Sequence, residues 1–158
     1  MHIFFQEYLE RLTALHQDTL KAIDGLPAEA LDWTPLSNSS AETNSINVLI
    51  THFCGAERYW IGDVGLGDLS SRVRAAEFQV KGMSVDDLIA RINTATEYAR
   101  TALEKFSFDD LEAERKSPRD GHVFTVGWAL LHAMEHTAIH LGHIQITRQL
   151  WDQETNKT

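Results

Sequence analysis

The chain has 158 residues, of which 43% are apolar and 23% are charged, and its formal net charge is −9. This length and balance favour one globular domain over residues 1–158, and the acidic charge argues against binding to nucleic acid or anionic membrane surfaces. No apolar run approaches the ~18 residues of a membrane span, the N-terminus lacks a secretory pattern, and the single Cys54 cannot form an internal disulfide. We therefore expect a cytoplasmic protein.

A long helix is predicted over residues 2–24, where apolar side chains recur every three to four positions and form one buried stripe. Gly25 supplies a natural end for this helix. Residues 26–42 contain two prolines and a Ser-Asn-Ser-Ser run. They are expected to form a connector with one short turn of helix at 28–31.

The second and third long helices are predicted from their N-terminal caps. Asn44 or Ser45 caps the second helix, which should end after Trp60, before a series of glycines. The sequence Ser84-Val85-Asp86-Asp87 has the form of a capping box and opens the third helix, whose apolar stripe continues to Phe106. The roughly twenty residues between the two helices can run the length of a bundle.

A fourth helix is expected from Thr125 to Leu150, after a polar segment at 107–122. Its apolar residues lie almost all the way round, which is typical of a helix buried on more than one side. Since strand-like alternation is absent, the predicted fold class is all-α, a four-helix bundle. The apolar surface of this helix and of parts of the first exceeds what a four-helix core can cover, so we expect a homodimer.

Histidine is concentrated on the fourth predicted helix, at His132, His136, His140 and His143. At 100° per residue, all four side chains project within an arc of about 80°. Two histidines one turn apart can bind one ion at the ~2.0 to 2.1 Å typical of zinc. The best candidate for a third ligand is His52, from the apolar side of the second helix, although a single histidine there is more often an ordinary core residue. Three imidazoles leave open coordination positions, as in a catalytic site.

A second motif involves some of the same residues. His132-Ala133-Met134-Glu135-His136 matches H-x-x-E-H, the pattern of a small metal-dependent hydrolase in which two histidines bind zinc and Glu135 is the general base. Five residues are a weak signal in a helix so rich in histidine. The remaining histidines are expected outside the site, on the solvated flank of the first helix or in a loop: His2, His16 and His122.

Three segments together resemble a known family: Gly25-Leu26-Pro27 with Leu31-Asp32-Trp33-Thr34-Pro35, Ser45-Ile46-Asn47-Val48-Leu49-Ile50-Thr51-His52, and His132-Ala133-Met134-Glu135-His136-Thr137-Ala138-Ile139-His140-Leu141-Gly142-His143. The chain is similar over about residues 1–151 to the DinB-like superfamily, the DinB and YfiT group of metal-dependent bundles. The resemblance implies an up-down-down-up helix order with a long connection between helices two and three. It also implies a nickel or zinc site on His52, His136 and His140, with His132 as a reserve ligand or substrate contact.

The resemblance further implies a low-molecular-weight thiol as cosubstrate, because characterised relatives are mycothiol-dependent isomerases or bacillithiol S-transferases. The expected function is therefore a metal-dependent enzyme in which the open metal position activates a thiol. The alternative is a non-catalytic bundle that binds a metal or a small ligand. Family members often carry Arg-Gly-Gln after the last histidine, where this chain has Leu141-Gly142-His143, so a contribution of His143 stays open. Candidate pocket residues, for which packing in the core or at the surface is nevertheless the more common role, are Glu57, Tyr59, Trp60 and Trp128.

Overall fold

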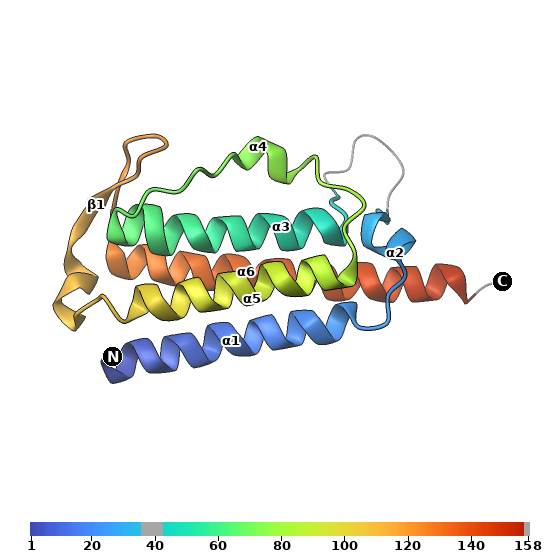
Figure 1. Cartoon of the computed structure of the whole chain (residues 1–158), viewed down its shortest axis with the longest axis horizontal. Helices are drawn as coiled ribbons and strands as arrows, with labels where there is room; N and C mark the ends of the chain where they lie inside the picture. Colours follow the sequence, from blue (N-terminus) through green and yellow to red (C-terminus); the bar gives the residue numbers. More distant parts are fainter. Residues whose placement is uncertain (36–42, 157–158) are drawn as a thin grey trace.

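Long helices lie side by side in the computed structural model, which describes residues 1–35 and 43–156 (Figure 1). They are α1 (Ile3–Ile23), α3 (Ile46–Glu57) with its π-helical continuation η1 (Arg58–Leu66), α5 (Val85–Leu103) and α6 (Val126–Thr155). The short helix α2 (Ala28–Asp32) follows α1, where a turn of helix was expected. This arrangement agrees with the predicted helical bundle.

The predicted helix starts coincide with side-chain caps. The hydroxyl of Ser45 accepts a hydrogen bond from the backbone N–H of Val48, and Ser84 forms a reciprocal capping box with Asp87. Thr125 caps α6. This last helix continues beyond the predicted end at Leu150, because Trp151 packs against Trp33 with 5.8 Å between ring centroids.

The predicted end of the second helix was wrong. The helical path does not stop before Gly62 but continues as η1 to Gly67, which adopts a left-handed conformation with φ 72°. Gly62 gives room within η1 to two side-chain ends, since a Cβ there would displace the Arg58 guanidinium and the Tyr98 hydroxyl. π-Helical segments are rare and often occur at functional sites.

Two connections contain structure that the sequence did not predict. The long link between η1 and α5 carries α4 (Arg74–Glu77) and returns along the bundle (Figure 1). Between α5 and α6 lie the 3-10 helix η2 (Phe108–Glu112) and an antiparallel pair of strands, β1 (Glu114–Lys116) and β2 (Val123–Thr125). Strands of three residues are too short to show a detectable alternation.

The apolar core forms two clusters separated by polar side chains. One cluster includes Phe5 and Leu12 of α1 together with Leu130 of α6. The other includes Ile23 of α1 and Ile144 of α6. The same two helices carry buried or half-buried polar residues between these positions: His16, Thr19, His136, Thr137 and His140. His16 was expected on a solvated flank, and this was wrong because its side chain is only 1% exposed.

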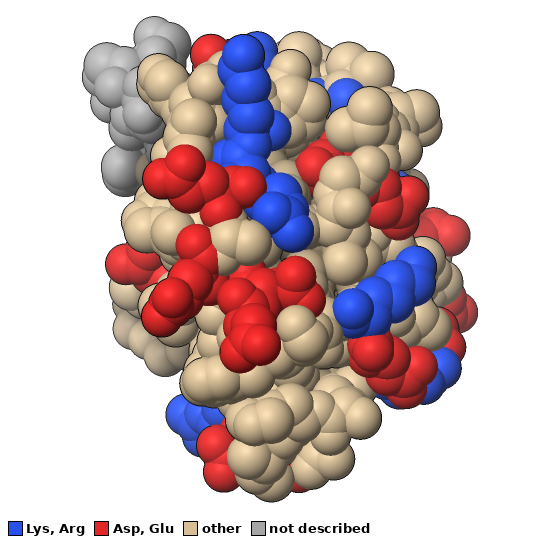
Figure 2. Space-filling view, turned by 90° about the vertical axis from the view of Figure 1, so that its left-hand side faces the viewer, with Lys and Arg blue, Asp and Glu red and all other residues tan. Residues whose placement is uncertain are grey.

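The surface carries charges of both signs. Acidic and basic side chains are interspersed on the end of the molecule that bears the β-hairpin (Figure 2). Within the described residues, no helix combines the length and the apolar character that a membrane crossing requires.

Candidate metal centre

Three histidines from two helices converge between the apolar clusters. His52 comes from α3, whereas His136 and His140 lie one turn apart on α6, and one ring nitrogen from each falls within 4.8 Å of the others. His52 is buried and the other two are half-buried. The structure thus brings together the three residues that the sequence singled out as ligands.

The two α6 rings face each other through their Nε2 atoms, which are 3.3 Å apart. This separation allows both nitrogens to lie ~2.1 Å from one shared ion. Among the described residues, neither Nδ1 atom has a hydrogen-bond partner, although both are buried. A hydrogen bond between the two rings would use a single proton, so a cation that engages both Nε2 lone pairs satisfies this pair better. The donor set therefore fits a divalent metal ion.

The protonation of the two rings favours the same interpretation. Burial lowers the pKa of His136 to about 3, with further contributions from His140, His52 and other neighbours. Burial also lowers the pKa of His140 to about 4, reinforced by His52 and His143. Both imidazoles are consequently neutral near pH 7, and metal ligation requires the neutral form.

His52 is oriented by a residue far from it in the sequence. Its Nδ1 lies 2.8 Å from a carboxylate oxygen of Glu77 on α4, and Arg72 donates two hydrogen bonds of 2.6 and 2.9 Å to the same carboxylate. Burial alone would raise the pKa of Glu77, but the hydrogen bonds from His52 and Arg72 outweigh this effect and lower it. The Nε2 of His52 is left to face the other two histidines.

Aromatic side chains lie next to the histidines along α6. His132 stacks on Trp128 with 4.7 Å between ring centroids, and the edge of Trp60 contacts both rings. Phe78, from the connector, lies 4.7 Å from the His52 ring. Of the candidate pocket residues, Trp60 and Trp128 therefore lie near the site.

His132, Glu135 and His143 lie beside the three-histidine group and not within it. The His132 ring is 5.9 Å from that of His136, and its Nδ1 is 3.7 Å from the exposed carboxylate of Glu135. His143 is exposed, with its ring 5.6 Å from that of His140. The two histidines of the H-x-x-E-H motif therefore do not form a ligand pair with each other. His136, the second histidine of the motif, faces His140 and not His132.

A buried polar network near the site was not predicted. Glu57 accepts hydrogen bonds of 2.6 Å from Thr137 and pairs with His16 at 2.8 Å. The other ring nitrogen of His16 lies 2.7 Å from the hydroxyl of Thr96. Glu57 is therefore a core residue. The feature of the sequence that could have revealed the network is this single carboxylate in an otherwise apolar helix.

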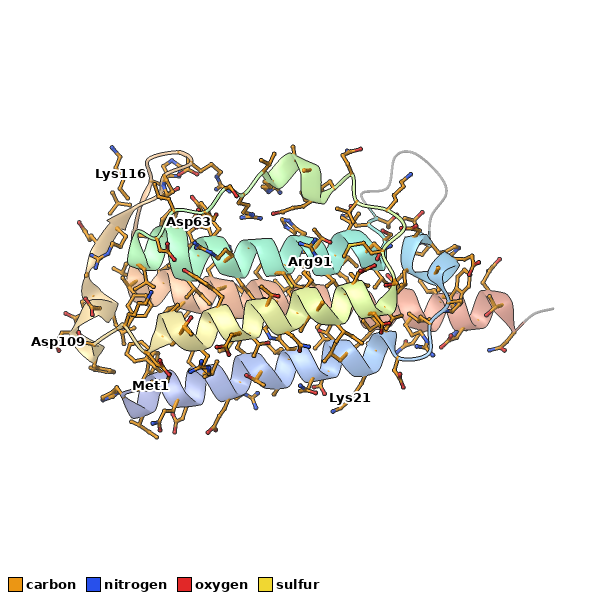
Figure 3. All side chains as sticks on the ribbon, viewed as in Figure 1. Met1, Lys21, Asp63, Arg91, Asp109 and Lys116 are labelled. Carbon is orange, nitrogen blue, oxygen red and sulfur yellow. The ribbon has the colours of Figure 1, made fainter. Side chains whose placement is uncertain are left out.

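A cleft of about 810 Å³ opens between α3, α5 and the connector that carries α4. Arg91, labelled in Figure 3, lines it from α5, and Arg72 and Glu77 line it from the connector. The three histidines are not among its lining residues. Glu77 therefore stands between this cleft and the ring of His52. Cys54 also borders the cleft, and burial followed by the nearby Glu57 raises the pKa of its thiol.

Comparison with known proteins relates this arrangement to one family. The chain matches the family model of Mycothiol-S-transferase over residues 7–153. This is a DinB/YfiT-like family, which confirms the resemblance found in the sequence. A crystal structure of a conserved protein from Enterococcus faecalis has a similar fold, with a TM-score of 0.70, 14% identity, and coverage of 92% of this chain and 95% of that one. None of the curated proteins matches the chain.

Proposed function

Because this chain belongs to the mycothiol S-transferase family, we propose that it is a metal-dependent enzyme that transfers a low-molecular-weight thiol to an electrophilic small molecule, or uses such a thiol to isomerise one. The observation that supports this most directly is the pair of facing Nε2 atoms of His136 and His140, 3.3 Å apart, with His52 beside them. Three nitrogen ligands leave room for a substrate atom, as in catalytic metal sites.

A bound divalent ion, which we expect to be nickel or zinc, would lower the pKa of a thiol held next to it. Imidazole ligands alone do not select between these metals. In the transfer, the S–H bond breaks, a sulfur–carbon bond forms, and the leaving group departs with its electron pair. His132 is our candidate to receive the thiol proton, since it borders the site and its Nδ1 faces Glu135. Trp60 is buried and packs against both His132 and Trp128 on this side of the site.

The proposal also includes the order of the helices and the cellular location of the protein. The family supports an up-down-down-up helix order, and a connector that returns along the bundle fits that order (Figure 1). A cytoplasmic location is supported by the buried, unpaired Cys54 and by the need for a reduced thiol cosubstrate.

The first test is the metal content of protein purified without a histidine tag. We expect close to one equivalent of metal in the wild type and in His122→Ala, whose exposed imidazole serves as a matched control. Metal should be lost in His52→Ala and His140→Ala. The metal-loaded protein should then consume thiols such as mycothiol in the presence of a panel of electrophiles, with the products identified by mass spectrometry.

The thiol-transfer assay and the removal of the metal distinguish a catalytic role of the ion from a structural one. A metal-loaded wild type that transfers no thiol across a broad panel would contradict the enzymatic role. Removal of the metal with a chelator separates the remaining alternatives, because loss of a structural ion should unfold the chain, whereas loss of a catalytic ion leaves it folded. We expect the second result, since the two apolar clusters join α1 to α6 without the histidines.

A further inference from the structure

A close contact occurs between α3 and the connector, at Gly55. A Cβ atom at this position would lie 2.2 Å from Oε1 of Glu77 and 3.1 Å from Nε of Arg72. Real side chains do not tolerate the first of these distances, so any residue other than glycine would displace the carboxylate. Gly55 and His52 are both in α3, three positions apart, and therefore lie on the same side of the helix.

The displaced carboxylate is the one that holds the His52 ring. Glu77 uses Oε2 to accept the Nδ1–H of His52, while Arg72 binds both of its oxygens. Arg72, Glu77 and His52 have side-chain exposures of 11%, 8% and 8%, so water competes little for these bonds. A charge-assisted hydrogen bond of this kind fixes which ring nitrogen carries the proton.

We propose that Gly55, Arg72 and Glu77 form a positioning device for the metal ligand His52, in which the absence of a side chain at Gly55 admits the Glu77 carboxylate that keeps the proton on Nδ1 and leaves Nε2 free for the ion. The inference rests on the proposed metal site. It assigns a task to the long connection between η1 and α5: α4 delivers the carboxylate. Glu77 would not itself be a ligand, because its carboxylate is engaged with Nδ1 of His52 and with Arg72.

The geometry differs from that of an ion pair that merely fastens the connector. A fastening pair would need only Arg72 and Glu77, which are five positions apart in the same segment. Here the carboxylate reaches across to another helix and uses its second oxygen on the one side chain that completes the three-histidine group. Partners of this kind typically change metal affinity by about 10- to 100-fold.

The test is a double-mutant cycle with zinc affinity as the readout. The variants are Gly55→Ala, Glu77→Ala and the two combined, and Gly142→Ala is the matched control because a Cβ there would contact nothing within 4 Å. Zinc dissociation constants are measured by competition with a chelator. We expect each of the first two variants to bind zinc about 10- to 100-fold more weakly, and Gly142→Ala to bind as the wild type does. The combined variant should bind as Glu77→Ala alone, since the carboxylate that the added methyl displaces is already gone.

A second readout does not depend on metal. In the metal-free wild type, the ¹⁵N spectrum of the imidazoles should show His52 protonated on Nδ1, and Gly55→Ala should move it toward the other tautomer. Glu77→Gln keeps the shape and one acceptor, so it should restore part of the zinc affinity lost in Glu77→Ala. Unchanged affinity and tautomer in Gly55→Ala, or additive losses in the combined variant, would overturn the inference. If the wild type binds no zinc but Gly55→Ala still shifts the tautomer of His52, the metal site is refuted and the positioning of the His52 ring by Glu77 stands.

Discussion

The Nε2 atom of His16 lies 2.8 Å from Oε1 of Glu57, and the two side chains are 1% and 3% exposed. Thr96 and Thr137 complete the contact, so that one polar side chain from each of α1, α3, α5 and α6 meets in the core. This network lies where the apolar clusters leave a gap. It joins all four helices next to the three histidines and fixes how α3 and α6 are aligned.

Breaking this network from one side should destabilise the fold strongly. We expect Glu57→Ala to reduce the free energy of unfolding by about 3 to 5 kcal/mol, because His16 and Thr137 then lose buried partners. The measurement is urea denaturation of the metal-free protein. Asp18→Ala, which removes a largely exposed pair with Lys21 on α1, is the control and should change stability by less than about 0.5 kcal/mol. Equal effects of the two substitutions would show that the core network contributes little.

His132 is expected to act in the reaction without binding the metal. His132→Ala should retain a full equivalent of metal, since the ring lies outside the group of three and stacks on Trp128. It should nevertheless lower thiol transfer by about 10²- to 10⁴-fold, the usual contribution of a proton-transferring group. Metal analysis and initial rates on the same preparation check both parts. Loss of metal in this variant would instead favour the H-x-x-E-H interpretation, with His132 as a ligand.

The sequence was informative wherever a local pattern determined the structure. Helix starts at Ser45, Ser84 and Thr125 follow from side chains that accept hydrogen bonds within the first turn. The convergence of His136 and His140 follows from their spacing of one turn on a helix. These features depend on residues close together in the chain and can therefore be read without the fold.

Features that depend on distant residues could not be predicted. The partner of His52 is Glu77, 25 positions away on a short helix inside a connector, and no periodicity points to it. His16 was assigned to the solvated flank of the first helix, but a carboxylate on α3, 41 positions away, satisfies it in the core. The π-helical continuation of α3 was hidden for a similar reason: its glycines suggested a helix end, whereas they admit Tyr98 and other side chains from neighbouring elements.

Tyr8 should make the stability of the fold sensitive to alkaline pH. Its hydroxyl donates a 2.6 Å hydrogen bond to the backbone carbonyl of Leu130, and burial, followed by the nearby Glu57 carboxylate, raises its pKa well above the usual range. A raised pKa means that the folded state favours the neutral phenol. The contribution of Tyr8 is therefore complete below about pH 10, the pKa of an unfolded tyrosine, and it falls by about 1.4 kcal/mol per pH unit above that value.

The comparison of wild type with Tyr8→Phe isolates this effect from other alkaline titrations. Urea midpoints measured between pH 8 and 11.5 should fall more steeply for the wild type once the pH exceeds about 10. At pH 8 the variant should be less stable by about 1 kcal/mol, the net value of one hydrogen bond. Parallel curves for the two proteins above pH 10 would mean that Tyr8 ionises freely in the folded state.

The outer face of α6 should mediate formation of the predicted homodimer. Leu131, Ile139 and Ile146 recur at spacings of eight and seven residues and are 63%, 51% and 56% exposed, so they form a row along the helix that is apolar except for the exposed Glu135 between the first two. Apolar rows of this kind on a surface commonly mark protein contacts, and a two-fold axis lets the same row bury itself against its copy. A new charge at the Ile146 end of the row, away from Glu135, would have to be desolvated at the interface.

Ile146→Asp is therefore expected to convert the protein from twice the chain mass of 17.9 kDa to a single chain mass, as measured by light scattering at micromolar concentration. Ile146 is exposed and lies six positions beyond the ligand His140 on α6, so metal content should stay at the wild-type level. Val123→Asp provides the control, because Val123 is 57% exposed but lies on the hairpin and outside the row. That variant should remain dimeric. A wild type with the mass of one chain at this concentration would contradict the dimer, and dissociation by both substitutions would place its interface elsewhere than on α6 alone.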